Sequence, residues 1–381
     1  MVRVGIAGIG AIAESYMKLF EEGLIEDALL TGLSSRNRER VEGLLKTCHL
    51  PEAVYYGTYE EMLASDEVDA VILTTPHAQH VPMALLAMKA GKHVLSDKPL
   101  GNKAFEVRAL VEEEKKHPKL VTGVLFNRRS SDLYQKVKSL VESGEMGELR
   151  RVIYEITNLY RSYRYYEDSS WRGTYEEEGA GVLMNQAIHQ LDLLLYLTGL
   201  PASVRAFMKE GFHRPMTTEN DAALHLFYEN GASGHFLAST HESPGLNRLT
   251  LSFSKGQIEV EDDAKLKITR LSEEEEDFAR KTDQHFLHVA KTVEEYSFSI
   301  LGNSEEHRRT IGNFIKAIQG KEKILCSFED GLKSITLVNA AHLSFWSGEE
   351  VPMTFSEVEY LLHFKGKVEE EKRVRSLQKK R

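Results

Sequence analysis

Residues Val2–Ala13 read VRVGIAGIGAIA, and this stretch decides the fold of the first part of the chain. Val2–Ala7 is a short apolar run, typical of a strand that is buried on both faces of a parallel sheet. The G-x-G-x-x-A pattern then predicts a tight turn at Gly8, close approach of the backbone to a pyrophosphate at Gly10, and a helix whose N-terminus faces that anion. The stretch therefore predicts dinucleotide binding along the turn, at Gly8, Ile9, Gly10, Ala11 and Ile12.

The end of the second strand bears on which nucleotide binds. Leu29–Leu33 is strand-like, and Ser34, Ser35 and Arg36 follow it. An acid here would bond the ribose 2′-hydroxyl of NAD, whereas an arginine accommodates the 2′-phosphate of NADP. Because the acid is missing, Ser35 and Arg36, with Arg38 as a further candidate, favour NADP or the use of both nucleotides. The alternative is an exposed helix start whose arginines are solvated.

Strands and helices alternate as far as about residue 125, which predicts a doubly wound parallel sheet of the Rossmann type. His77 and His80 lie near the start of the helix that follows the strand Val68–Leu73, where they could contact the cofactor or cap the helix. That strand ends in three residues that we expect to contact the cofactor: Thr74, Thr75 and Pro76.

Val94–Pro99 reads VLSDKP and carries the first chemical signal. It is a short strand between two helical stretches, so Lys98 should project from the carboxyl edge of the sheet, where open α/β sheets bind ligands. An ammonium there can donate to a substrate oxygen, and burial can lower its pKa toward a working value. Asp97 belongs to the same edge. Asn127, after the strand Leu120–Phe126, is a further cofactor candidate, with surface pairing as the alternative.

From Gly147 onward the pattern changes to consecutive strands with short turns, which predicts an α/β domain with a large, open, mainly antiparallel sheet. We expect a dinucleotide-binding domain over residues 1–126, a substrate and oligomerisation domain over 127–365, and a charged tail over 366–381 that protrudes or frays. The acidic run 273–277 reads as a solvated loop. The open face of the sheet predicts a homodimer or homotetramer.

Residues 179–199 are predicted as an apolar helix that carries Asn185, His189 and Asp192 within an arc of roughly 60° on one face. Such a stripe is either a satisfied core network or the wall of an active site. His189 has the intrinsic pKa to take a hydroxyl proton near neutral pH, and Asp192 could fix its tautomer.

Aromatic residues and arginines interleave between residues 160 and 172. Tyr160 and Tyr163 suit stacking on a sugar or another flat polar ligand, so we predict substrate contacts there. The alternative is an aromatic loop that closes over a core.

Composition excludes several classes of partner. The net charge is −10, which disfavours nucleic acid and anionic membranes. No apolar stretch approaches the roughly 18 residues needed to cross a bilayer. The two cysteines have no ligand spacing and the N-terminus shows no leader pattern, so we expect a cytoplasmic protein without a metal site.

These motifs together resemble the Gfo/Idh/MocA oxidoreductases over residues 1 to about 350. The resemblance implies a Rossmann domain followed by an open-sheet domain, NADP or NAD as cofactor, and a sugar, cyclitol or related polyol as substrate. It implies that Lys98 lies beside the reacting oxygen and that His189 is the acid or base. Trp171 and Arg172 carry part of the resemblance and are expected at the cofactor.

Two positions depart from the family pattern. Asp97 stands where the family usually has Glu, and Asn185 stands where an aspartate is frequent. Asn185 can bind a sugar hydroxyl but carries no proton, so the acid and base roles fall to His189 and Lys98. Three alternatives to the dehydrogenase remain: transient oxidation that cleaves a glycosidic bond with tightly bound NAD, a nucleotide-sensing regulator, and a Rossmann-like protein whose polar helix face is only structural.

Overall fold

The computed structural model describes residues 1–168 and 170–378, which form two compact units. The first unit combines residues 1–131 with 301–335, and the second combines 132–300 with the residues from Thr336 onward. The sequence placed residues 301–335 in the second domain. In the structure this segment packs with the first unit instead, because its apolar side chains complete that unit's core.

The described part of the first unit contains a six-stranded sheet in the order β3-β2-β1-β4-β5-β6. Its strand pairs are parallel, as the alternating pattern predicted. The strands are β1 (Val2–Ala7), β2 (Ala28–Ser34), β3 (Val54–Tyr56), β4 (Ala70–Leu73), β5 (His93–Ser96) and β6 (Thr122–Val124). The helices are α1 (Ala11–Glu21), α2 (Arg38–Thr47), α3 (Tyr59–Ala64), α4 (His77–Lys89), α5 (Ala104–Glu114), the 3₁₀ turn η1 (Asn127–Ser130) and α10 (Asn303–Ile318).

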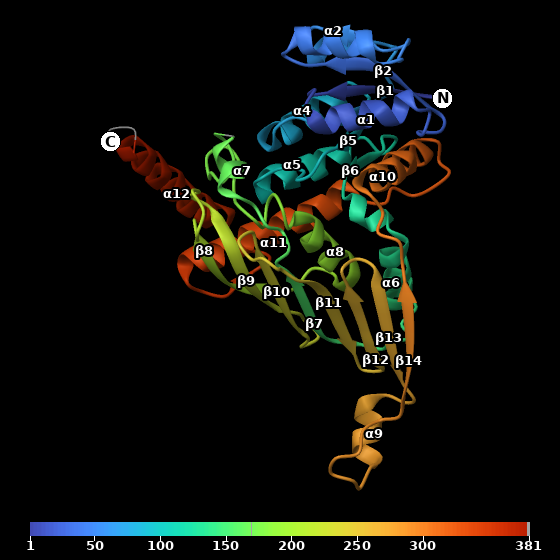
Figure 1. Cartoon of the computed structure of the whole chain (residues 1–381), viewed down its shortest axis with the longest axis vertical. Helices are drawn as coiled ribbons and strands as arrows, with labels where there is room; N and C mark the ends of the chain where they lie inside the picture. The colour runs from blue at the N-terminus through green and yellow to red at the C-terminus, as the bar shows by residue number, and fades with distance from the viewer. Residues whose placement is uncertain (169, 379–381) are drawn as a thin grey trace. The chain divides into compact units, whose positions relative to one another are not determined.

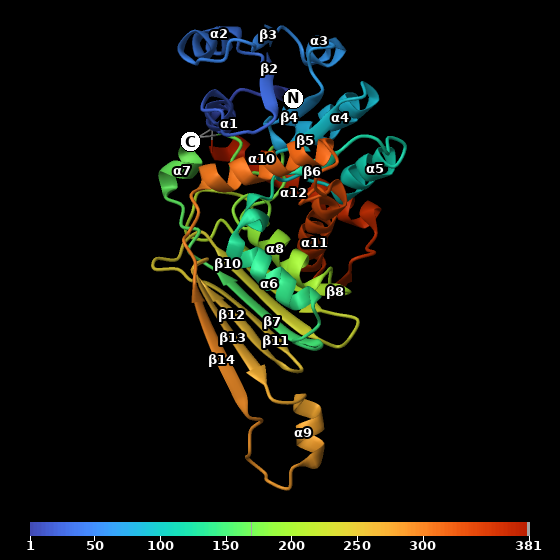
Figure 2. The ribbon, with the colours of Figure 1, turned by 90° about the vertical axis from the view of Figure 1, so that its right-hand side faces the viewer.

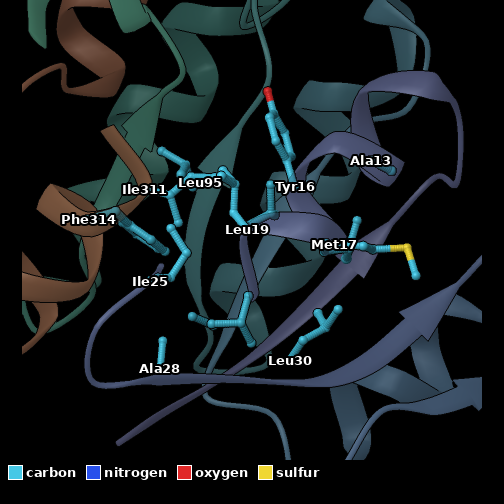
Figure 3. Packing of buried hydrophobic residues seen from close by; sticks show 14 of the residues in the cluster. Ala13, Tyr16, Met17, Leu19, Ile25, Ala28, Leu30, Leu95, Ile311 and Phe314 are labelled. Atoms are coloured by element: carbon cyan, nitrogen blue, oxygen red, sulfur yellow. The ribbon is translucent and has the colours of Figure 1, made fainter. Parts of the chain in front are cut away.

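The core of the first unit explains why α10 belongs to it. Ile311 and Phe314 of α10 are fully buried in one cluster with Tyr16 and Leu19 of α1 and with Leu95 of β5 (Figure 3). Burying an aromatic or aliphatic side chain of this size contributes about 1.5–3 kcal/mol. The distant segment is therefore an integral part of the nucleotide-binding unit.

The described part of the second unit contains a nine-stranded sheet in the order β14-β13-β12-β11-β7-β10-β9-β8-β15. Pairing is antiparallel except between β7 and β10. The strands are β7 (Leu149–Ile156), β8 (Ser203–Glu210), β9 (Glu219–Phe227), β10 (Ser233–Ser239), β11 (Asn247–Phe253), β12 (Gly256–Glu261), β13 (Lys265–Leu271), β14 (Lys291–Ser297) and β15 (Val351–Pro352).

Helices α6 and α8 lie over one face of this sheet (Figure 2). The helices are α6 (Asp132–Glu142), α7 (Tyr163–Glu167), α8 (Ile188–Thr198), α9 (Glu275–Lys281) and α12 (Glu357–Gln378), while α11 (Phe328–Ser347) contains the point at which the two units divide. Buried and half-buried residues alternate along β9 and β10, as expected for strands with one covered and one open face.

Two charged segments differ from the prediction. The acidic run 273–277 was expected as a loop, but α9 begins within it, at the tip of the excursion between β13 and β14 (Figure 1). The tail 366–381 was expected to fray, but α12 runs through it as far as Gln378. Tyr360 and Phe364 pack on Trp346, which anchors the helix. The last three residues of the predicted tail lie outside the described part of the chain.

Within residues 1–168 and 170–378, no helix combines the length and the apolar character needed to cross a membrane.

Candidate active site

The turn after β1 has a backbone that requires glycine. Gly8 has φ +92°, and a Cβ placed on it would lie 2.7 Å from Thr75 Cγ2 and 2.9 Å from Thr75 N. Any side chain there would collide with the end of β4. Thr74 Oγ1 donates to the carbonyls of Ala7 and Gly8, which ties the ends of β1 and β4 together.

A cavity of about 560 Å³ opens at this turn. Gly10 is the N-cap of α1, and apart from its chain neighbours no residue lies within 4 Å of the position its Cβ would take, so a ligand can approach the backbone there. The cavity contains most of the turn and strand-end residues predicted to bind the cofactor: Gly8, Ile9, Gly10, Ser35, Arg36, Thr74, Thr75 and Pro76. Its size, its glycine cradle and the helix N-terminus fit a dinucleotide.

Sequence reasoning missed one wall of this cavity. Gly57, Thr58, Tyr59 and Glu60 line it from the start of α3. The signal was the capping box in which Thr58 and Glu61 bond each other's backbone N–H groups. Glu60 therefore supplies the cavity with a carboxylate, a group that is missing at the end of β2.

His80 was predicted to contact the cofactor, and its placement does not fit that prediction. The ring is 1% exposed, with Nδ1 at 2.7 Å from the Pro99 carbonyl and Nε2 at 2.6 Å from the Thr75 carbonyl. Burial lowers the pKa of His80, while the Pro99 carbonyl and the Asp97 carboxylate oppose that shift. His80 therefore links the loop after β4, at Thr75, to the loop after β5, at Pro99. Ile12 is partly buried and packs against the core of the first unit. Ala11 is exposed in the first turn of α1. A role for His77 at the cofactor remains a prediction.

Asp97 and Lys98 follow β5 at the carboxyl edge of the sheet, as predicted, and both are half-buried. Asp97 Oδ1 accepts a hydrogen bond from the Lys98 backbone N–H at 2.8 Å. Burial lowers the pKa of His307, a residue of α10. The Asp97 carboxylate opposes this shift, and the Lys98 ammonium adds to it. Lys98 thus interacts electrostatically with two histidines, His80 and His307.

Asn127 was predicted as a cofactor contact, and one end of its amide bonds a residue of α10. Its Nδ2 donates to Glu306 Oε2 at 2.7 Å, and Arg128 pairs with the other oxygen of Glu306 at 3.3 Å. Asn127 and Glu306 are both buried. These contacts hold the start of α10 near the end of β6, and a contact of Asn127 with the cofactor remains a prediction.

In the second unit, the segment before α8 is held by a buried carboxylate. Glu219 is fully buried and accepts hydrogen bonds from Gly181 N at 2.8 Å and Leu183 N at 3.1 Å. A Cβ on Gly181 would lie 1.8 Å from the Glu219 carbonyl oxygen, so only glycine allows this approach. His342 Nε2 lies 2.9 Å from Glu219 Oε2 and pairs with the same carboxylate.

This anchored segment positions the predicted polar residues. Helix α8 begins at Ile188, so Asn185 lies in the turn before the helix, and the predicted single helix over 179–199 was wrong. Asn185 and His189 are half-buried between apolar residues that are fully buried, whereas Asp192 is buried at 1% exposure. Asn185 and His189 therefore reach the surface of the second unit where its apolar packing ends.

The aromatic segment 160–172 forms a stacked cluster with arginines. The Arg214 guanidinium lies over Tyr160 at 5.2 Å and over Tyr163 at 5.6 Å. Both tyrosine side chains are about half exposed, so they are accessible to a ligand. Arg172 stacks on the Tyr165 ring at 4.2 Å and donates to the Tyr165 carbonyl, and it also lies over Trp171. Arg172 and Trp171 thus brace this loop, and their contact with the cofactor remains a prediction.

Comparison with known proteins agrees with both units. Residues 2–124 match the oxidoreductase family with an NAD-binding Rossmann fold, and residues 134–259 match the GFO/IDH/MocA C-terminal domain. The chain belongs to the GFO/IDH/MocA oxidoreductase family. Its first unit carries an NAD-binding Rossmann fold, and the protein is an oxidoreductase.

Three similar proteins each match most of the chain. Myo-inositol 2-dehydrogenase of Thermotoga maritima is 26% identical over 350 residues, which are 90% of this chain and 96% of the relative. The WlbA dehydrogenase of Bordetella pertussis, solved with NADH and UDP-GlcNAcA, has a TM-score of 0.74 and 24% identity, covering 93% of this chain and 99% of that one. Levoglucosan dehydrogenase, solved with NADH and levoglucosan, has a TM-score of 0.75 and 19% identity, covering 93% and 100%. These two structures share the fold.

The buried pair of Glu219 and His342 predicts a pH-dependent stability. Burial lowers the pKa of His342, but Glu219 overrides it and holds the pKa above the ordinary value of 6.5. The pair therefore stabilises fully below pH 6.5, and its contribution is lost as the pH rises through the folded-state pKa. Urea unfolding should show this decline in the wild type but not in the Glu219→Gln/His342→Gln double variant.

The single variant His342→Gln provides the second half of this test. It leaves Glu219 buried without its cation, so we expect it to lose about 3–5 kcal/mol of stability at pH 6, more than the double variant loses. Equal pH slopes in the wild type and the double variant would contradict the ion pair.

Proposed function

We propose that this GFO/IDH/MocA enzyme transfers a hydride between a nicotinamide and a secondary alcohol or keto carbon of a sugar, cyclitol or sugar derivative. The observation that carries the proposal is the pair of accessible polar side chains, Asn185 and His189, at the edge of an apolar segment fixed by Glu219. The dinucleotide cavity of the first unit supports it. The bound nicotinamide supplies the hydride acceptor or donor.

Each catalytic residue has a separate task. His189 takes the hydroxyl proton when the alcohol is oxidised and returns it in the reverse direction, for which imidazole has a suitable intrinsic pKa. Lys98 donates a hydrogen bond to the reacting oxygen and stabilises negative charge that develops there. Asn185 orients the substrate through a hydroxyl group. Asp192, one helical turn from His189 on α8, fixes the tautomer of the histidine.

The substrate class rests on the exposed aromatic cluster and on the relatives. Tyr160 and Tyr163 provide accessible rings for the apolar face of a sugar ring. The similar proteins include a myo-inositol dehydrogenase and a levoglucosan dehydrogenase, whose substrates are polyhydroxylated rings. A ring that carries several hydroxyl groups satisfies both the aromatic surface and the polar residues Asn185 and His189. The cytoplasm, which supplies such metabolites and NAD(P), is the proposed location.

We propose that both nucleotides bind, with NADP favoured. Arg36 is exposed at the cavity and can pair with a 2′-phosphate, whereas Glu60 in the same cavity can accept a hydrogen bond from a ribose hydroxyl.

We also propose a homodimer or homotetramer that forms through the open face of the second sheet. Ile153 on the central strand β7, His225 on β9 and His235 on β10 lie side by side on this face and are half-buried. The His225 ring contacts His235 and stacks on Phe227, with ring centroids 4.5 Å apart in each case. A partly apolar sheet face of this kind is a suitable surface for a second copy.

Replacing the proposed catalytic residues should abolish turnover without unfolding the protein. We expect Lys98→Ala and His189→Ala each to reduce kcat by about 10²–10⁴-fold with an identified polyol, because each variant lacks a proton-transfer or oxyanion-stabilising group. Steady-state NAD(P)H absorbance measures the effect. Lys119→Ala and His285→Ala, which change exposed residues of the same types, are the controls. Wild-type turnover in both catalytic variants would refute the proposal.

Arg36→Ala should weaken NADPH binding by roughly tenfold or more while changing NADH binding much less, since only NADPH has the 2′-phosphate. Fluorescence titration of both nucleotides measures this preference. Arg38→Ala is the matched control, because Arg38 is occupied by an i,i+4 ion pair with Glu42. An equal loss for both nucleotides would show that Arg36 does not read the phosphate.

Ile153→Glu should convert the oligomer to monomers, since it places a carboxylate beside Glu155 in the middle of the open face. Light scattering after gel filtration measures the molar mass. Val358→Glu changes an apolar residue on α12 that is 69% exposed and should leave the mass unchanged. A wild-type protein that is already monomeric would overturn the proposed interface.

A further inference from the structure

The Asn185 side chain is held by a buried acid that sequence reasoning did not identify. Asn185 Nδ2 donates a hydrogen bond to Glu178 Oε1, and Glu178 Oε2 accepts the backbone N–H of Gly173 at 2.5 Å. Glu178 is 2% exposed, whereas the preceding acids Glu176 and Glu177 are exposed. One carboxylate of the three thus turns inward, and each of its oxygens has a defined donor.

The loop around Glu178 is fixed from both sides. The backbone N–H groups of Glu178 and Gly179 both donate to the Thr174 carbonyl, at 3.2 and 3.1 Å, which closes a tight turn. On the other side, Gly181 is anchored to Glu219, and the Asn185 backbone N–H donates to the Gly181 carbonyl at 3.1 Å. The carboxylate and the amide therefore meet in a preset geometry.

This contact determines which end of the Asn185 amide is used for binding. A carboxylate has only acceptor oxygens, so the amide must direct its NH₂ group toward Glu178. Flipping the amide would place two oxygens against each other in a buried site, which is unfavourable. The carbonyl oxygen of Asn185 is then turned away from Glu178, and a carbonyl oxygen accepts from a hydroxyl or N–H donor.

We propose that Glu178 is a positioning residue that fixes Asn185 as a hydrogen-bond acceptor for a substrate hydroxyl. This inference rests on the proposed function, because Asn185 is taken to contact the substrate. It follows that a substrate hydroxyl donates to the Asn185 carbonyl oxygen, and that a substrate carbonyl or carboxylate facing this oxygen is disfavoured. The negative charge is at Glu178, which contacts Asn185 rather than the substrate.

Exchanging the two groups tests the proposal. In Glu178→Gln, the new side chain can keep its oxygen on Gly173 N only by directing its NH₂ group at Asn185, so the Asn185 amide turns and offers its own NH₂ group to the substrate. In Glu178→Gln/Asn185→Asp, the glutamine NH₂ group donates to the new carboxylate, which again offers an acceptor to the substrate. The double variant should therefore recover function that the single variant loses.

Kinetics with myo-inositol, D-glucose and levoglucosan provide the first readout. We expect Glu178→Gln to raise KM by roughly tenfold or more with a smaller change in kcat, and the double variant to recover most of that loss. Glu177→Gln makes the same chemical change at the neighbouring exposed acid and should leave KM unchanged. A KM for Glu178→Gln equal to that of Glu177→Gln, or a double variant no better than the single ones, would overturn the proposal.

Thermal unfolding provides a readout that needs no substrate. Asn185→Asp alone sets two carboxylates against each other, so its melting temperature should fall at pH 8 and recover in the double variant. Additive effects of the two changes would overturn the assigned amide orientation. If the wild type oxidises none of the three polyols, the proposed function fails for them, while the unfolding cycle still decides whether Glu178 orients the amide.

Discussion

The hydrogen bonds to the Glu219 carboxylate are the constraint on which the second unit depends. This fully buried group accepts from two backbone N–H groups of the segment 181–183 and pairs with His342. A buried carboxylate without these partners would be strongly unfavourable, so the segment and α11 cannot move away from β9 independently. The geometry of Asn185 and His189 thus derives from a buried charge that fixes the backbone just before them.

A second buried acid, Glu178, acts closer to the proposed substrate. Glu219 fixes the backbone of the segment 181–183, and Glu178 fixes the side-chain amide of Asn185. The two carboxylates together preorganise one polar surface. Preorganisation of this kind reduces the free energy that binding must spend on ordering side chains. A regulator that only senses nucleotide would need the cavity of the first unit but not this arrangement, which favours a catalytic role.

The sequence predicted those parts whose signals are local. β1 and the turn at Gly8 follow from an apolar run and from glycine spacing, and they lie where the sequence placed them. α3 has six residues, too few to show a helical periodicity, so the wall that contains Glu60 was missed. α12 is rich in charged residues, and tertiary contacts that the sequence does not show hold it in place: Tyr360 packs on Trp346, and the buried Glu371 accepts hydrogen bonds from Glu176 N and Thr217. Glu178 lies in the run Glu176–Glu178, where composition cannot show which acid is buried. His80 reads as a ligand because its two carbonyl partners are set by tertiary structure.

The path of the chain through the two units has a consequence for synthesis. The first unit needs α10, whose residues Ile311 and Phe314 complete a core begun by β1 and α1. A ribosome must therefore have made more than three hundred residues before the nucleotide-binding unit can close, and by then the whole nine-stranded sheet except β15 has emerged. The nascent first unit exposes apolar surface throughout that interval, which makes it a natural client for chaperones. Truncation after residue 131 would leave it permanently in that state.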